Sequence, residues 1–220
     1  MSAAIQQLRR GYRANESVDR PLTQTEKAAM ISAAAATIAE LFETLRVDHR
    51  NDHNTRDTPR RVAKMFVEEV FHGRYAEPPA ITEFDNAEAF DGLIVTGPIE
   101  VRSTCAHHMM PIFGQAYIGV VPAHDGKIIG LSKYDRIVEY FASRLQIQEE
   151  LVKQIGQFIV DRTHPAGLAV RISAVHMCKT HRGVRSSRDS RMVTNAYFGT
   201  MSTCAELKSD FLRECVALGH

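Results

Sequence analysis

Two short stretches that lie far apart in the chain contain side chains typical of metal sites. The first, residues 103–108, reads Ser-Thr-Cys-Ala-His-His, and the second, residues 176–178, reads His-Met-Cys. Thiols and imidazoles are the ligands that zinc prefers in proteins. Because one ion would have to bind both stretches, the fold must bring them together. We expect the rest of the chain to form the frame that does this.

The spacing of these residues suggests a particular zinc site. Cys105 and His108 are three residues apart, which lets one turn of the chain offer two ligands. If residues 168–178 form a strand, His176 and Cys178 point to the same, largely apolar, face. Three ligands, Cys105, His108 and Cys178, with water in the fourth position would be a catalytic pattern. The alternative is a buried apolar thiol at Cys178 and histidines without a common role.

The composition excludes several classes of protein. The chain has 220 residues and a formal net charge of +1, so overall charge gives no reason to expect binding to nucleic acid or a membrane surface. There is no apolar run long enough for a membrane span and no secretory signal. We therefore expect a cytoplasmic protein, in which the four cysteines are thiols or metal ligands rather than disulfides.

The chain divides into an arm, a helical part and a larger mixed part. We predict an arm over residues 1–24, helices within 25–76 and the main domain over 77–220, because Pro78 and Pro79 break the chain. Apolar residues at helical spacing between positions 5 and 12 leave a short amphipathic helix in the arm as the alternative.

Two helices are predicted in the N-terminal part. The first spans residues 25–45, with Thr25 as its cap, and the second begins at Asp57, as the cap before Pro59, and continues to about residue 71. Arg60, Arg61 and Lys64 place positive charge at the start of this second helix, where the helix dipole disfavours it. Local conflicts of this kind often mark functional sites.

The main part is predicted to be of the α+β class, with one hairpin turn at residues 124–127, before Ile128 and Ile129. Strands are expected over residues 93–104, 114–121, 168–178 and 193–198, and helices over residues 133–143, 147–164 and 205–218.

Positive charge gathers locally and suggests an anion site. Ser132 is the expected cap of the helix starting at Lys133, and Lys133 and Arg136 share a face, an arrangement suited to phosphate. A second group follows Cys178 and consists of Lys179, His181, Arg182, Arg185, Arg188 and Arg191. The alternative is ordinary solvated surface charge. No Walker-type loop and no Gly-x-Gly-x-x-Gly occurs.

Taken together, these motifs closely resemble GTP cyclohydrolase I. They are Ser-Thr-Cys-x-His-His at 103–108, Gly-Leu-Ser-Lys-x-x-Arg-Ile-Val at 130–138, Arg-Leu-Gln-Ile-Gln-Glu at 144–149, His-Met-Cys-x-x-x-Arg-Gly at 176–183, and Asp-Thr-Pro-Arg-Arg-Val-Ala-Lys-Met at 57–65. Their common order along the chain makes the resemblance specific, although no single motif would.

The resemblance implies a tunnelling fold, in which antiparallel sheets and helices of several subunits form a toroid, commonly a decamer, with sites at subunit interfaces. It implies a hydrolase acting on cyclic amidines, which opens the imidazole ring of GTP and releases C8 as formate. A rearrangement of the ribose and ring closure would then give 7,8-dihydroneopterin triphosphate, at the first step of tetrahydrofolate biosynthesis.

The same resemblance implies roles for individual residues. Cys105, His108 and Cys178 would hold zinc, whose water would attack C8, while His107 and His176 would move protons. The guanine edge would pair with Glu149, together with Gln148. The residues expected to hold the triphosphate are Ser132, Lys133, Arg136 and Arg182, with Arg61 and Lys64 from a neighbouring subunit.

One departure from the family lies inside the central motif. The family usually has Glu where this chain has Ala106, so a carboxylate beside the site is lost while the expected ligands remain. A catalytically impaired homologue that binds GTP or a pterin is therefore an alternative. A zinc deaminase is a further alternative, but His-x-Glu and the later Pro-Cys-x-x-Cys of that class are both missing from the sequence.

Overall fold

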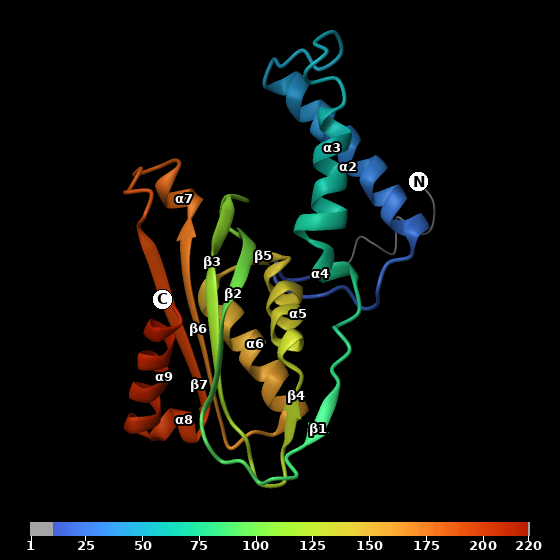
Figure 1. The fold of residues 1–220 in the computed structure, drawn as a ribbon. Coiled ribbons are helices and arrows are strands. Elements are labelled where there is room, and N and C mark those ends of the chain that lie inside the picture. Colours follow the sequence, from blue (N-terminus) through green and yellow to red (C-terminus); the bar gives the residue numbers. More distant parts are fainter. Residues whose placement is uncertain (1–10, 220) are drawn as a thin grey trace. The chain divides into compact units, whose positions relative to one another are not determined.

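The computed structural model describes residues 11–219. The chain forms two compact units, Met1–Glu77 and Pro78–His220, and each is described separately below (Figure 1). No helix among the described residues is long and apolar enough to cross a membrane. The predicted arm is described from Gly11 onward, where it contains no helix before Gln24; positions 5–10 lie outside the described residues.

The first unit is built on α2 (Gln24–Thr44), whose cap is Thr23 and not the predicted Thr25. The Thr23 side chain accepts from the Glu26 backbone N–H at 3.2 Å, and Glu26 accepts from the Thr23 N–H at 2.8 Å. This reciprocal capping box satisfies two N–H groups that a helix start otherwise leaves unpaired. Thr25 lies inside the first turn and cannot take that role.

The second predicted helix is divided into α3 (Thr58–Met65), a π-helical turn η1 (Phe66–Val70) and α4 (His72–Tyr75). Asp57 precedes α3 but makes no side-chain capping bond, because its backbone is already helical rather than extended. The π turn brings the rings of Phe66 and Phe71 into a stack 5.1 Å apart. Helices α2 and α3 then pack around Ile31, Ala63 and Val67.

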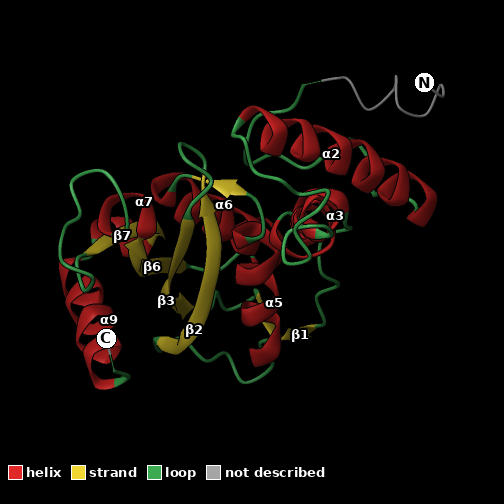
Figure 2. Ribbon diagram, turned by 90° about the horizontal axis from the view of Figure 1, so that it is seen from above, coloured by secondary structure: helices red, strands yellow, loops and turns green. Residues whose placement is uncertain are grey.

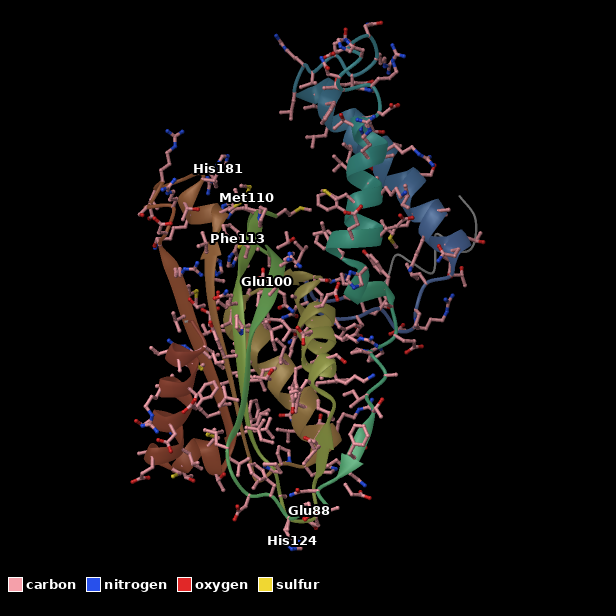
Figure 3. The ribbon with its side chains drawn as sticks, in the orientation of Figure 1. Glu88, Glu100, Met110, Phe113, His124 and His181 are labelled. Carbon is pink, nitrogen blue, oxygen red and sulfur yellow. The ribbon has the colours of Figure 1, made fainter. Side chains whose placement is uncertain are left out.

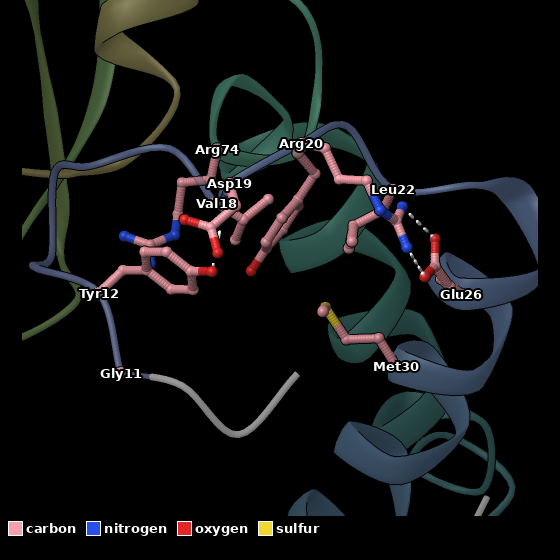
Figure 4. A pocket seen from close by; sticks show the side chains of 10 residues that line it. Gly11, Tyr12, Val18, Asp19, Arg20, Leu22, Glu26, Met30 and Arg74 are labelled. Carbon is pink, nitrogen blue, oxygen red and sulfur yellow. Dashed lines mark hydrogen bonds and ion pairs between the residues drawn. The ribbon is translucent and has the colours of Figure 1, made fainter. Parts of the chain in front are cut away.

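A cavity of about 700 Å³ lies within this unit (Figure 4). The guanidinium of Arg20 pairs with Glu26 at 2.5 Å, and that of Arg74 donates to the Arg13 carbonyl at 2.9 Å. These charged side chains are thus engaged within the unit. The cavity is lined by Gly11, Tyr12, Val18, Asp19, Arg20, Leu22, Glu26, Met30, Arg74 and Tyr75.

The second unit is a curled five-stranded sheet in the order β5-β2-β3-β6-β7 (Figure 1). Its strands are β2 (Ile94–Cys105), β3 (Pro111–Val121), β5 (Leu145–Gln146), β6 (Gly167–His176) and β7 (Arg191–Gly199). Neighbouring strands are antiparallel, except that β5 runs parallel to β2. The mixed α+β class therefore agrees with the sequence prediction.

Helices cover both faces of this sheet (Figure 2). On one face, α5 (Leu131–Ala142) and α6 (Gln148–Thr163) pack on the larger core, which includes Ile118, Val170 and Ile172. On the other, α8 (Thr200–Thr203) and α9 (Ala205–Ala217) cover a smaller core around Tyr117 and Phe211. Because both faces are covered, β6 is buried at eight of its ten positions, whereas buried and exposed residues alternate in β2 from Ile99 to Arg102.

A turn lies at the predicted residues 124–127, where the Gly126 N–H donates to the Ala123 carbonyl, but the predicted hairpin is wrong. The strand that follows the turn, β4 (Lys127–Ile129), pairs with β1 (Glu83–Asp85) in a separate two-stranded sheet. The Asn86 side chain explains this pairing, since its amide donates to the carbonyls of Ala123 and Phe90 at 3.0 and 2.8 Å. These bonds tie the end of β1 to the turn before β4.

Candidate metal centre

The register of the sheet brings the two metal-binding stretches together. Ile112 on β3 lies opposite Ser103 on β2 and opposite His176 on β6. The end of β2, at Cys105, and the end of β6, at His176, therefore meet at the same end of the sheet. Met110 and His181 mark this end in Figure 3, and His124 marks the other.

Cys178 lies beyond the end of the strand, contrary to the prediction. β6 stops at His176, and Cys178 belongs to the short helix α7 (Met177–Thr180). This helical turn still directs the thiol toward the sheet, because the ligand atoms of Cys105, His176 and Cys178 all lie within 4.8 Å of one another. Two thiols and an imidazole at this spacing fit a single zinc ion.

The two adjacent histidines lie on a tight turn after β2. The Met109 N–H donates to the Cys105 carbonyl at 2.9 Å, which closes the turn. His107 Nδ1 lies 3.8 Å from Cys105 Sγ, within reach of the thiol cluster. His108 instead accepts from the Arg182 guanidinium, Nε2 to Nη1 at 3.1 Å. The ligand role of His108 thus stays a prediction.

Without a bound cation, the surroundings favour the neutral forms of the His176 imidazole and the Cys178 thiol. Burial lowers the pKa of His176, an effect that Glu149 opposes and Lys179 reinforces. Burial and the neighbouring Cys105 raise the pKa of the Cys178 thiol. A bound zinc ion would favour the thiolate, as metal coordination deprotonates thiols.

Gln148 is a buried residue that contacts the cluster. It opens α6 and is 1% exposed. Its Oε1 lies 2.7 Å from His176 Nε2. Its Nε2 lies 3.1 Å from each of three acceptors, which are the carbonyls of Ile172 and Met192 and the hydroxyl of Thr194. The next residue, Glu149, is exposed.

Comparison with known proteins identifies the family. The sequence profile of GTP cyclohydrolase I matches residues 34–216. The chain belongs to the GTP cyclohydrolase I family.

Relatives named GTP cyclohydrolase 1 support this assignment. The one from Erwinia tasmaniensis is 36% identical over 194 residues, which cover 88% of this chain and 86% of the relative. One from Shewanella baltica is 41% identical over 165 residues, covering 74% and 75%. Among solved structures, the apo archaeosine synthase QueF-Like covers 56% of this chain and 97% of its own at 11% identity. Its TM-score of 0.38 is too low to establish a common fold.

In this member of the GTP cyclohydrolase I family, the predicted phosphate residues of α5 lie away from the metal centre. α5 begins at Leu131 after its cap, Gly130, so Ser132 is a helical residue and not the predicted cap. The helix ends next to β5, which pairs with Cys105. Its twelve residues rise by about 1.5 Å each, about 18 Å in all. Figure 1 shows α5 starting beside β4 and ending beside β5, which is nearer the metal end of the sheet.

Lys133 and Arg136 also lie in the first two turns of α5, before the end of the helix that adjoins β5. Arg61 and Lys64 belong to α3 in the first unit, where they pair with Asp57 and Glu68 at 3.6 Å each. These acidic partners offset the positive charge at the helix start. Of the residues predicted to hold phosphate, the structure places Arg182 beside the cluster, through His108.

Sequence reasoning missed the contact between Gln148 and His176. Family resemblance assigned Gln148 to the guanine edge, and that assignment stays a prediction. In the structure its amide contacts the chain itself. A buried amide at the first position of an amphipathic helix was the available signal, since a polar group there needs partners within the protein.

Proposed function

We propose that this protein catalyses the zinc-dependent hydrolysis of GTP, with release of formate and formation of 7,8-dihydroneopterin triphosphate, the first step of tetrahydrofolate biosynthesis. The observation that supports this is the cluster of Cys105, His176 and Cys178 in a chain of the GTP cyclohydrolase I family. The donor set and its spacing fit zinc, and the relatives' name supports the substrate.

Zinc would be held by Cys105, His108 and Cys178. When bound, it lowers the pKa of a water molecule enough for attack on C8 of the purine. We take His108 as the third ligand because the resemblance of the 103–108 motif to the family assigns it that role. To bind zinc, the His108 ring would have to give up its hydrogen bond to Arg182. His176 and His107 are then free to move protons to and from the purine nitrogens and the ribose.

We assign the guanine edge to Glu149, whose carboxylate can accept two N–H groups that adenine does not offer. It is exposed and its charge acts on His176, so it lies near the reacting part of the site. Arg182, next to His108, can pair with a phosphate of the triphosphate.

The remaining phosphate residues support a shared site. Ser132, Lys133 and Arg136 lie about 9 to 15 Å of helix before the end of α5 that adjoins β5. We propose that they, with Arg61 and Lys64, complete the site of a neighbouring subunit in a toroidal homo-oligomer of the tunnelling fold, commonly a decamer. In the described part of the chain, β7 and most of β2 have one edge without a strand partner. Pairing of these edges between neighbouring subunits would close a ring of subunits.

The test uses full-length protein purified with zinc and incubated with GTP. We expect formate together with a pterin that becomes fluorescent on oxidation. Cys178→Ser should abolish both products, because it removes a predicted zinc ligand. Retained activity in that variant, or ammonia as the product in place of formate, would show that the proposal is wrong.

A second candidate function is a GTP- or pterin-binding protein with impaired turnover. It is favoured by Ala106, at a position where the family usually has a carboxylate. Tight GTP binding without either product would support it. Ala106→Glu would then be expected to restore formate release.

A further inference from the structure

The orientation of the Gln148 amide is set by the sheet on which it rests. Its Nε2 faces the carbonyl oxygens of Ile172 on β6 and Met192 on β7, each at 3.1 Å. Carbonyl oxygens only accept hydrogen bonds, so the NH₂ group must point toward them. The reversed amide would place Oε1 against both oxygens, and acceptors would then face one another with no donor between them.

This orientation decides which atom of Gln148 meets the histidine. With the NH₂ group turned toward the strands, Oε1 faces His176 Nε2 at 2.7 Å. An amide oxygen only accepts, so His176 Nε2 must be the donor and must bear a proton. A neutral imidazole has one proton, and the lone pair of His176 therefore lies on Nδ1.

We propose that Gln148 is a positioning residue that holds the His176 ring in place and in the tautomer protonated at Nε2, with the lone pair on Nδ1. This inference rests on the proposed function for its catalytic meaning, but the tautomer itself follows from the hydrogen bonds. It also gives Gln148 a role that needs no contact between its side chain and guanine.

Nitrogen-15 NMR under magic-angle spinning tests the tautomer directly. The full-length, zinc-loaded protein would be labelled at its ten histidines, and the His176 signals would be assigned from their loss in His176→Asn. We expect Nε2 to be protonated and Nδ1 to be bare in the wild type. A wild-type spectrum with the proton on Nδ1 and none on Nε2 would overturn the inference.

Gln148→Met tests whether the amide causes this state. We expect the single tautomer to be lost and kcat to fall about tenfold or more, with zinc retained and KM for GTP nearly unchanged. An increase in KM with the tautomer preserved would instead indicate a contact with the substrate and would overturn the inference.

Gln146→Met is the matched control. Gln146 is also fully buried, but its amide nitrogen bonds to Phe141 and Gln154 and not to His176. The same substitution there should leave the tautomer as in the wild type, and a change of tautomer in this control would count against Gln148 as the cause.

Turnover separates the two proposals. Formate release by a protein whose His176 is protonated at Nδ1 would overturn only the inference. Protonation at Nε2 in a protein that releases no formate would support the tautomer and contradict the proposed function.

Discussion

At the scale of single residues, the three histidines near the thiols have different surroundings. His176 is held by Gln148, His107 approaches Cys105, and His108 bonds to Arg182. Only a lone pair free of such partners can bind a metal. When zinc binds, there are therefore two cases. Either the hydrogen bond between His108 and Arg182 breaks and His108 becomes a ligand, or the bond remains and His108 is not a ligand.

Substitution of two histidines distinguishes these cases. We expect His108→Asn to lose zinc and activity together, because a predicted ligand is removed. His176→Asn should keep zinc and lose activity by about 100-fold or more, as for removal of a proton-transfer group. Metal analysis of both purified variants checks this; zinc retained in His108→Asn and lost in His176→Asn would make His176 the third ligand.

The residues of the metal stretches could be found from sequence because thiols and imidazoles are few and their spacing is local. The position of Cys178 in a helical turn could not be predicted. A strand that continued to residue 178 would also have placed Cys178 near His176, so the sequence pattern did not distinguish the two structures. The role of Gln148 was also hidden, because two of the partners that orient its amide are backbone carbonyls on different strands, which cannot be read from the side-chain pattern.

At the scale of elements, the start of α2 is stabilised by charge. The Arg20 guanidinium and the bonds from Thr23 hold the pKa of Glu26 at about 2, below its ordinary value of 4.5. A lowered pKa in the folded state stabilises the fold above the unfolded pKa, and this contribution disappears as the pH falls toward the folded pKa.

Glu26→Gln should therefore lower the thermal midpoint at neutral pH. The difference from the wild type should shrink as the pH falls from about 4.5 toward 2, because protonation removes the same charge in the wild type. Thermal unfolding followed by circular dichroism at several pH values measures it. A difference that does not vary with pH would show that the charge is unimportant.

Close packing of β3 against β6 is what aligns the metal stretches. A Cβ added at Gly114 would lie 2.1 Å from the Ser173 carbonyl and 2.5 Å from the Ala174 Cα. Both are backbone atoms that cannot move aside without separating the strands.

Gly114→Ala should thus cost about 1–3 kcal/mol of stability, as overpacking does, and reduce zinc retention. Denaturant unfolding and metal analysis check both effects. Gly130→Ala is the control, since the nearest atom to its added Cβ is 4.0 Å away. Equal stability of both variants would contradict the packing argument.

Elements with strong local signals were predicted well. α6 and α9 begin and end within one residue or so of their expected limits, because apolar periodicity and Pro165 are local features. The pairing of β1 with β4 was not predicted, since it depends on the Asn86 side chain bridging segments far apart in sequence.

At the scale of the whole molecule, α5 separates the predicted phosphate residues from the thiols of the same chain. If sites are shared, Lys133→Ala and Cys178→Ser damage different halves of each interface. Mixed oligomers of these two inactive variants would then contain some intact sites.

We expect unfolding and co-refolding of the two variants to restore part of the GTP turnover that each lacks alone. Light scattering would confirm that the mixture has the mass of the wild-type oligomer. Mixed oligomers of full mass without recovered activity would show that each subunit uses its own α5, contrary to the proposal.

The anchoring of Gln148 has a consequence for how this sequence can drift over evolutionary time. Two of its three partners on the sheet are main-chain oxygens, at Ile172 and Met192. Every amino acid supplies such an oxygen, so replacement of the side chain at position 192 leaves the bond available. The side chain at position 192 can therefore change without loss of the contact that orients Gln148.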